Sequence, residues 1–503
     1  MPENIRSLIV ILIIALFGFA FAKKAVSGVV SDSTYNQWRK IWLLLTISAF
    51  TIPGYWLFMA IGAILIYKFT KPIENKVALY FILLFIAPPI HMEIPGFGII
   101  NYFFIFSYPR LVSLTVLLPA AIAISKQNEF KFGKSWTDKV ILLFMLQFFL
   151  MISFDASITD GMRKAFYMFL DVFLPYYVAS RGIKNMEQLR TVFVAFIIPA
   201  LILSIIGILE NGKSWLLYNS VYDHLGVEYD ISHYIGRMGG IRAVTSFDIS
   251  IIFGYFLAVA MGFYLVIYPS IQSKIIKYLG FLILSLGLVS SLSRGPWVGA
   301  TVLFIVYTLQ GKNKFKKISI LALLGMTLLA ALLTVPGGQK YLNLLPFIGT
   351  TESENVEYRE KLFDNAIIVI NRNPFLGTLG SDKYLQEPEM QELRQGQNII
   401  DIVNSYILVA LISGYIGLSL FVSAFVSVIA GIISYKRYIK NKSVELHNIG
   451  SALVSILISI MLMIATASSI GAIPLIYLTV MGLGVAYTQV VINHIKENLN
   501  EHS

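Results

Sequence analysis

The chain has 503 residues, of which 57% are hydrophobic and only 13% are charged. Soluble domains are about half apolar and about a quarter charged, so this composition excludes a soluble globular enzyme and a disordered chain. The chain has no cysteine, which excludes disulfides, thiolate metal sites and cysteine nucleophiles. The net charge of +11 fits cytoplasmic loops that face anionic lipid, and we expect no nucleic-acid partner.

Apolar blocks recur along the whole chain, and a helix needs about 20 such residues to cross a bilayer. They predict an all-α polytopic membrane protein, in which residues 1–503 form a single integral membrane domain with about twelve to fourteen transmembrane helices. The block at 41–67 contains Pro53-Gly54, so it is either one broken helix or two short ones. The blocks are 5–22, 41–67, 77–90, 110–124, 140–154, 166–179, 191–209, 249–268, 278–292, 297–310, 318–335, 405–433, 449–468 and 475–495.

Lysine and arginine gather in every second connection between these blocks, which predicts that those connections face the cytoplasm. The other connections include two long ones, 210–248 and 336–404, which we expect outside the cytoplasm. The first block is read as a retained signal anchor because Lys23-Lys24 follows it, and an even number of spans would keep both chain ends in the cytoplasm. The Lys-rich loops are 68–76, 126–139, 181–190, 274–277, 312–317 and 436–442.

The loop at 210–248 carries Arg237 and Arg242 among glycines that let the backbone approach a ligand closely. Arg242 leads directly into the next block, so it is expected at the membrane surface, where interfacial anchoring is the alternative role. The same loop holds four side chains that could ligate a metal, although their spacing is weak evidence for a site: His224, Glu228, Asp230 and His233.

The segment Ser291–Trp297 separates two apolar blocks and contains the start of a helix. Pro296 suits the first helical position and Gly295 is acceptable as its cap. Arg294 would then lie beside free backbone N–H groups at the positive end of the helix dipole, which makes a good site for a phosphate. The alternative is an arginine that extends to the lipid headgroups.

Residues 354–370, in the loop 336–404, predict an amphipathic helix that ends at Asn371–Pro374. This helix is either interfacial, with Arg359 on its solvated side, or a lid that turns Arg359 towards a cavity in the membrane. Its apolar face is expected to carry Val356, Phe363, Ile367 and Ile370.

The end of the same loop carries Asp401 at the mouth of a span. If this stretch is already helical, Asp401 and Ser405 share a face, with Asn404 beside them. A carboxylate there can act as a general base, or it can simply favour the start of a helix. Arg163 follows two acids in the loop before residue 166, and Asp171, inside the next block, either has a function or pairs with an arginine.

Several segments in this order resemble the O-antigen ligase and O-antigen polymerase family of membrane enzymes, over roughly 155–433. Arg237 to Arg242-Ala243 is similar to the arginine-bearing end of the outer loop that precedes the family's large outer loop. The other segments that carry the resemblance are Ser291–Trp297, Tyr358-Arg359-Glu360, Asn373–Gly377, Asn404–Ile407 and Gly414–Leu418.

The resemblance implies a glycosyltransferase of the GT-C type that inverts the anomeric carbon and needs no metal or other cofactor. Its donor would be a glycan on undecaprenyl diphosphate at the outer face of a bacterial cytoplasmic membrane. Arg242 and Arg294 would stabilise the diphosphate, and Asp401 would be the base. The residues expected to bind substrate are Arg163, Arg237, Arg359, Asn404 and Tyr406.

One position departs from the family: its histidine falls on Val403. We therefore expect a polysaccharide polymerase that joins lipid-linked repeat units, with ligase-type transfer to another lipid or protein as the alternative. A flippase for lipid-linked glycans and a metal-dependent transferase that uses Glu228 and Asp230 are further readings. The expected partners are lipid-linked oligosaccharides and membrane lipid, with a chain-length regulator as a candidate.

Overall fold

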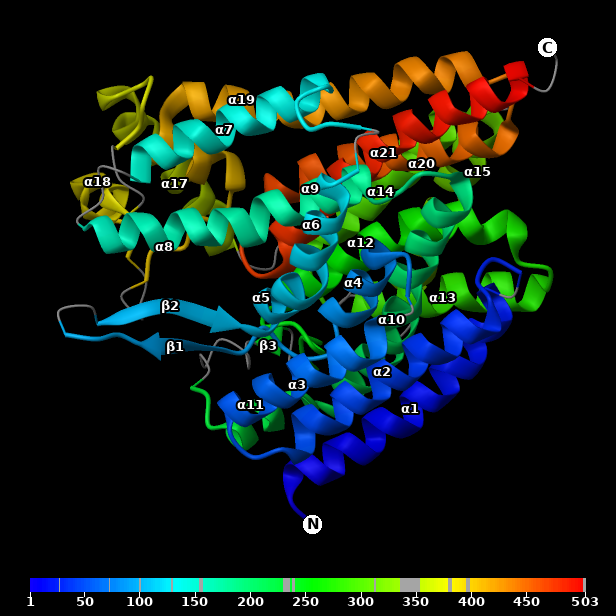
Figure 1. The fold of residues 1–503 in the computed structure, drawn as a ribbon, viewed down its shortest axis with the longest axis horizontal. Helices are drawn as coiled ribbons and strands as arrows, with labels where there is room; N and C mark the ends of the chain where they lie inside the picture. Colours follow the sequence, from blue (N-terminus) through cyan, green and yellow to red (C-terminus); the bar gives the residue numbers. More distant parts are fainter. Residues whose placement is uncertain are drawn as a thin grey trace.

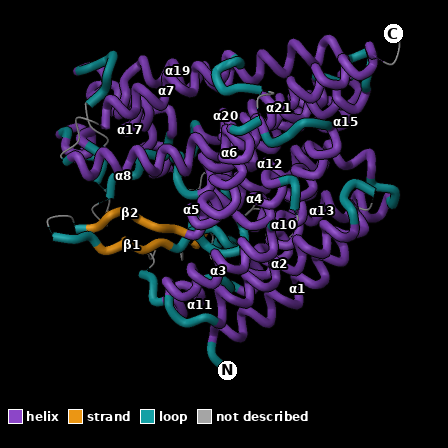
Figure 2. Tube along the Cα trace, viewed as in Figure 1, coloured by secondary structure: helices purple, strands orange, loops and turns teal. Residues whose placement is uncertain are grey.

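The computed structural model describes residues 1–26, 28–71, 73–98, 101–127, 130–152, 157–228, 236–237, 240–311, 314–334, 353–378, 382–394 and 399–500. These residues form a bundle of closely packed helices (Figures 1 and 2). Strands form two small antiparallel hairpins in the described part: β1 (His91–Pro95) with β2 (Tyr102–Ser107), and β3 (Gly236–Arg237) with β4 (Gly240–Ile241).

The helices follow the apolar blocks of the sequence. In the first half they are α1 (Glu3–Val26), α2 (Asp32–Thr51), α3 (Tyr55–Thr70), α4 (Lys76–Leu84), α5 (Tyr108–Val112), η1 (Ser113–Leu117), α6 (Leu118–Ser125), α7 (Trp136–Ile152), α8 (Ile158–Met168), η2 (Phe169–Phe173), α9 (Leu174–Arg181), α10 (Met186–Lys213) and α11 (Asn219–Leu225). In the second half they are α12 (Ser250–Ile267), η4 (Tyr268–Ser270), α13 (Lys274–Ser290), α14 (Arg294–Leu309), α15 (Lys314–Thr334), α17 (Ser353–Arg372), η5 (Lys383–Gln386), α18 (Pro388–Gln391), α19 (Ser405–Ile439), α20 (Val444–Ile464) and α21 (Ala472–Asn500).

The chain is an all-α polytopic membrane protein, as its composition predicts. Among the described residues, seven helical stretches are long and apolar enough to cross a bilayer: Glu3–Val26, Tyr108–Ser125, Met186–Lys213, Ser250–Ser270, Ser405–Ile439, Val444–Ile464 and Ala472–Glu497. Each of the other predicted blocks also contains a helix, although these helices are shorter or less apolar. The expected count of about fourteen spans stays a prediction.

Contacts between loops support the predicted alternation of the connections. Arg181 pairs with Asp138, and Arg190 pairs with Glu445 beside the loop 436–442, so these Lys-rich loops lie together. Figure 1 shows the β1–β2 hairpin, α11, α17 and α18 at the opposite end of the molecule from the C-terminus. The described parts of the connections 210–248 and 336–404 therefore share one end of the bundle.

The expectation that both chain ends lie on one side is wrong. The Trp215 indole donates to Glu3 at 2.6 Å, and Asn4 lies 3.2 Å from the His224 ring, so the N-terminus sits beside loop 210–248. At the other end, Asn493 donates to the carbonyl of Lys184 in a Lys-rich loop.

The reason is the block at 41–67, which forms two helices, α2 and α3. They are separated at Pro53-Gly54, where Gly54 has a φ of +82°. Because two helices stand where one span was expected, each segment before α3 lies on the opposite side from the one expected. Lys23, Lys24, Arg39 and Lys40 then fall on the Lys-rich side, and Lys40 lies over the Phe69 ring at the end of α3.

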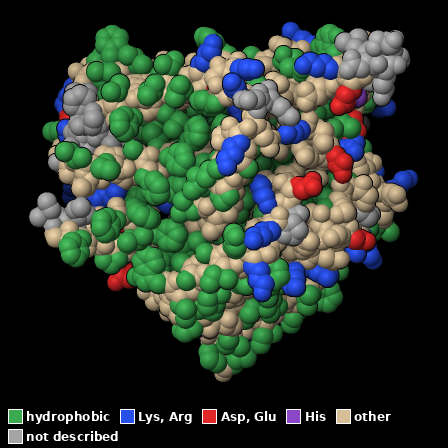
Figure 3. Space-filling view, in the orientation of Figure 1, with side chains coloured by type: hydrophobic (Ala, Val, Ile, Leu, Met, Phe, Trp, Pro, Cys, Tyr) green, Lys and Arg blue, Asp and Glu red, His purple; other side chains and the backbone are tan. Residues whose placement is uncertain are grey.

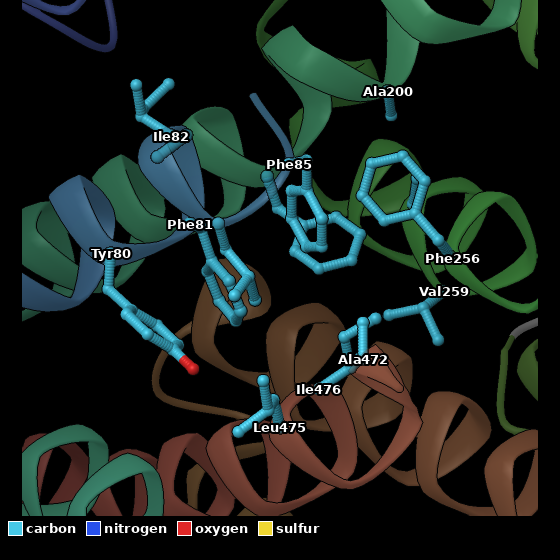
Figure 4. Close-up of a cluster of buried hydrophobic side chains, with 14 of the residues drawn as sticks. Tyr80, Phe81, Ile82, Phe85, Ala200, Phe256, Val259, Ala472, Leu475 and Ile476 are labelled. Atoms are coloured by element: carbon cyan, nitrogen blue, oxygen red, sulfur yellow. The ribbon is translucent and has the colours of Figure 1, made fainter. Parts of the chain in front are cut away.

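An aromatic cluster fixes α4, α10 and α12 against α21 (Figure 4). The rings of Phe85 and Phe256 are 4.3 Å apart, and Phe81 meets Phe196 edge-on at 4.8 Å. Every residue of α4 after its first is buried, which is the pattern of a helix enclosed by other helices. This core packs the middle of α10 against the first half of α12, the helix that follows Arg242 in the chain.

The outer surface of the bundle is apolar, as contact with lipid requires. Figure 3 shows large continuous areas of hydrophobic side chains, with Lys and Arg concentrated in the half that contains the C-terminus. Exposed apolar side chains include Phe17 of α1, Leu143 of α7 and Leu282 of α13. This distribution fits a protein whose sides face lipid and whose ends face water.

Candidate functional site

The turn before α14 is the first element of the site. Leu292 has a left-handed backbone with a φ of +46°, and the Ser291 hydroxyl and the Trp297 indole both donate to the carbonyl of Leu288. The helix begins at Arg294, two residues before the predicted Pro296. Arg294 thus lies in the first turn of a helix, where backbone N–H groups lack helical acceptors and attract anions, as the sequence predicts.

Arg242 lies against this same turn. Its Nη2 donates to the Ser293 hydroxyl at 2.8 Å, and its Nε lies 3.4 Å from the carbonyl oxygen of Ser291. The next amide, of Ala243, donates to Ser290 at 3.0 Å. The structure therefore brings Arg242, 49 to 51 residues away in the sequence, to the residues that immediately precede Arg294.

The connection between α20 and α21, residues 465–471, is a second element, and sequence analysis missed it. The Arg359 guanidinium donates to the Thr466 carbonyl at 3.3 Å, and the Ser468 hydroxyl donates to the Ile402 carbonyl at 2.5 Å. A Cβ atom added at Gly295 would lie 2.5 Å from the Thr466 hydroxyl oxygen. One turn of small residues thus touches α17, the segment before α19 and the start of α14.

Asp401 lies beside this turn, in the loop before α19. The Ser468 hydroxyl is 3.5 Å from the Asp401 carboxylate. The Tyr358 hydroxyl donates to the Asp401 carbonyl and accepts from the Asp401 backbone N–H. Partial burial raises the pKa of the Asp401 carboxyl, and the Ser468 hydroxyl and the Arg359 charge oppose part of that rise. A carboxylate held beside an arginine in this way can accept a proton from a hydroxyl.

The stretch from Asp401 to Asn404 is not helical, so the condition under which Asp401 and Ser405 would share a helical face is not met. Helix α19 begins only at Ser405, because the Asn404 side chain caps it by accepting from the N–H groups of Tyr406 and Ile407. The Tyr406 hydroxyl donates to Met461 of α20 at 2.8 Å. Asn404 and Tyr406 therefore have structural contacts that fix the entrance of α19 beside the turn 465–471.

Arg163 is placed differently from Arg242. Arg163 pairs with Asp160 at 2.6 Å, donates to the Tyr102 carbonyl and lies over the Tyr102 ring, so its contacts hold α8 against the β1–β2 hairpin. The backbone of Arg237 is in β3, paired with Gly240. Asp171 pairs with Arg110 at 2.8 Å, which confirms the pairing alternative for that residue.

The side chains proposed for a metal are only partly described. His224 contacts Asn4, and Glu228 lines an open surface pocket of about 480 Å³ together with Tyr222 and Asp223. Asp230 and His233 lie outside the described residues.

The predicted amphipathic helix is confirmed as α17, but only Ile370 of the expected apolar face is fully buried. Val356 and Phe363 are each 53% exposed, whereas the buried side chains are Leu362, Ala366, Val369 and Ile370. This set has the spacing i, i+4, i+7, i+8 and packs with Met390 of α18 and Leu411 of α19. Arg359 is exposed, yet its guanidinium reaches the turn 465–471.

The segment 373–378 docks on an interruption of α19. Gly414 has a φ of +62° inside that helix, and Gly377 has a φ of +72°. The Tyr415 amide donates to Pro374, the Thr378 amide donates to Leu411, and Gln147 of α7 donates to the Ser413 carbonyl. Gly377 and Gly414 let the backbone of 373–378 lie directly against that of α19. This contact gives a physical role to the motif segments Asn373–Gly377 and Gly414–Leu418.

Comparison with known families bears directly on this region. Residues 279–422 match the model of the O-antigen ligase family. The matched stretch runs from α13 into α19 and contains Arg294, Arg359 and Asp401. Arg163, Arg237 and Arg242 lie outside it, so the longer resemblance over 155–433 stays a prediction. A comparison with curated proteins found no matching relative.

Proposed function

We propose that the protein is a membrane glycosyltransferase of the O-antigen ligase type, which moves a glycan from a polyprenyl diphosphate, undecaprenyl diphosphate in bacteria, to an acceptor hydroxyl. The observation that carries this proposal is the contact of Arg242 with Ser291 and Ser293, two residues of the matched stretch that lie directly before Arg294. Two guanidinium groups beside the first turn of a helix suit a diphosphate leaving group.

The proposed reaction is a single displacement with inversion. The acceptor hydroxyl oxygen forms a bond to the anomeric carbon, and the bond from that carbon to the diphosphate oxygen breaks. The hydroxyl proton goes to Asp401, and the negative charge that develops on the diphosphate is stabilised by Arg242 and Arg294. Arg359 supplies further positive charge at the turn 465–471.

In this proposal the arginines take the place of a metal ion. The GT-C fold type and a site at the outer face of the cytoplasmic membrane belong to the same proposal. The Lys-rich loops at the opposite end of the bundle support this orientation. We expect turnover to be unchanged in excess EDTA. Loss of turnover that returns only with added divalent cation would instead favour the metal-dependent alternative with Glu228 and Asp230.

Two kinds of acceptor fit this site. Transfer to a different lipid or to a protein fits the matched family at least as well as polymerisation of repeat units does. Val403, at the position of the family histidine, favours polymerisation. Under polymerisation the acceptor is a second lipid-linked glycan, and a chain-length regulator would then be a candidate partner.

The test is to incubate the purified protein with a synthetic lipid-diphosphate oligosaccharide, with and without a second carrier. A ladder of products indicates a polymerase, and glycan on the second carrier indicates a ligase. If neither product forms while the substrate crosses the bilayer of a proteoliposome, the protein is a transporter and the proposal is wrong.

A further inference from the structure

Glu210, near the end of α10, has a fully buried carboxyl group, and both of its oxygens accept hydrogen bonds from backbone amides. One carboxyl oxygen accepts from the Leu217 N–H at 3.0 Å. The other accepts from Val244 at 3.1 Å and Thr245 at 2.8 Å. The side chain therefore fastens two stretches of loop 210–248 to the same helix end, and one of them directly follows Arg242.

The neighbouring residue fastens the other side of Arg242. Asn211 donates from its side chain to the Ile241 carbonyl at 2.7 Å. With the Ala243 amide bound to Ser290, the residues on both sides of Arg242 are fixed by contacts with α10 and α13. A short segment held at both ends gives its guanidinium a defined place beside Ser293.

The backbone around these contacts is strained. Within the described chain, the non-glycine residues with positive φ are Ser214 at 51°, Thr245 at 53° and Leu292 at 46°. Thr245 donates to Glu210, Ser214 is followed by an amide that donates to the Glu210 carbonyl, and Leu292 lies between the two serines that Arg242 contacts. Such conformations are unfavourable, above all for a β-branched residue, and persist only where surrounding contacts impose them.

We propose that Glu210 is the positioning residue of the site: it holds the segment 243–245 so that the Arg242 guanidinium meets the turn before Arg294. This inference rests on the proposed function, in which Arg242 binds the diphosphate. A carboxylate offers two acceptor oxygens, and both are occupied here, whereas a carboxamide offers one oxygen and an NH2 group. Glu210→Gln must therefore lose the hydrogen bonds on one side.

The test is the affinity of the full-length protein in detergent micelles for geranylgeranyl diphosphate. It compares the wild type with Glu210→Gln, Arg242→Ala and the double variant. We expect each single change to weaken binding by about fivefold or more, as the loss of a charge-assisted hydrogen bond does. Because Glu210 acts through Arg242, the double variant should bind no more weakly than Arg242→Ala alone.

Additive losses, or wild-type affinity in Glu210→Gln, would overturn the positioning role. If Arg242→Ala itself binds as tightly as the wild type, the diphosphate site of the proposed function fails as well, so the two failures can be told apart. If Glu210→Gln acted only by damaging the fold, it would lower diphosphate affinity by the same factor in the Arg242→Ala variant as in the wild type.

A second variant and a matched control guard against misfolding. Asn211 is half-buried, so Asn211→Ala should fold, weaken binding about fivefold and lose that effect in the Arg242→Ala background. Asp138 is a buried acid that also accepts backbone N–H groups, from Gly133 and Ser135, but among the Lys-rich loops. Asp138→Asn should lower the melting temperature and leave diphosphate affinity unchanged; a matching loss of affinity there, or none in Asn211→Ala, would contradict the inference.

Discussion

At the scale of single residues, the proposed chemistry depends most on Arg294. Replacing one preorganised donor to a developing negative charge costs about a hundredfold or more in rate. We therefore expect Arg294→Ala to lower turnover by at least about a hundredfold, while Arg294→Lys, which keeps the charge but loses the planar fork, should fall between the two. The measurement is product formation by purified protein, normalised to the folded fraction.

The control for Arg294 is Arg437, an exposed arginine at the Lys-rich end of α19. Arg437→Ala removes the same charge from the protein and should leave turnover unchanged. Equal losses in both variants would mean that net charge matters rather than the place of Arg294, and wild-type turnover in Arg294→Ala would remove it from the site.

Asp401 gives a prediction about pH. As a base it works only when deprotonated, so activity should rise as pH rises through its pKa. The Arg359 charge stabilises the carboxylate and lowers that pKa, so Arg359→Gln should raise it. The acidic limb of the kcat/KM profile should then move to higher pH, and Asp401→Asn should lower kcat with little change in the KM of the donor.

The comparison for this profile is Lys361→Gln, on the same helix. Lys361 pairs with Glu357 at 2.7 Å, so its removal changes the charge of α17 without removing the cation beside Asp401. An acidic limb that stays in place in Arg359→Gln, or that moves equally in Lys361→Gln, would speak against Asp401 as the base.

At the scale of elements, the interruption of α19 can be tested through its glycine. A Cβ at Gly414 would lie 2.5 Å from the backbone of Phe375, and the residue has a positive φ. Gly414→Ala should therefore destabilise the protein by roughly 1–2 kcal/mol from the backbone alone, with the clash in addition. Thermal unfolding in detergent measures the change.

Gly431, farther along α19, serves as its counterpart. The nearest atom to a Cβ there is a methyl carbon of Thr488 at 3.7 Å, an ordinary contact. Gly431→Ala should be neutral or slightly stabilising, since alanine favours the helix. If both alanine variants unfold alike, the docking of 373–378 on α19 is not what requires Gly414.

Sequence reasoning works at this scale where local pattern decides the structure. The apolar blocks predict the helices, and Ser291–Trp297 predicts a helix start beside an arginine, because hydropathy and capping are local properties. Sequence reasoning fails where contacts with distant parts of the chain decide the structure. The buried face of α17 depends on its contacts with Met390 and Leu411, not on the number of apolar residues. Glu210 and the turn 465–471 were missed because their contacts join residues tens to hundreds of positions apart.

At the scale of the whole molecule, the contacts of the N-terminus change the expected topology. The chain has no cysteine, so a single introduced one reports its own side of the membrane. Pro2→Cys and Glu392→Cys should both react with an impermeant maleimide in intact cells, because Glu3 contacts Trp215 of loop 210–248 and Glu392 lies in the other long loop. Lys442→Cys, in a Lys-rich loop, should react only after permeabilisation. Labelling of Lys442→Cys in intact cells would show that the orientation is the reverse of the one expected. Protection of Pro2→Cys together with labelling of Glu392→Cys would show that both chain ends lie in the cytoplasm.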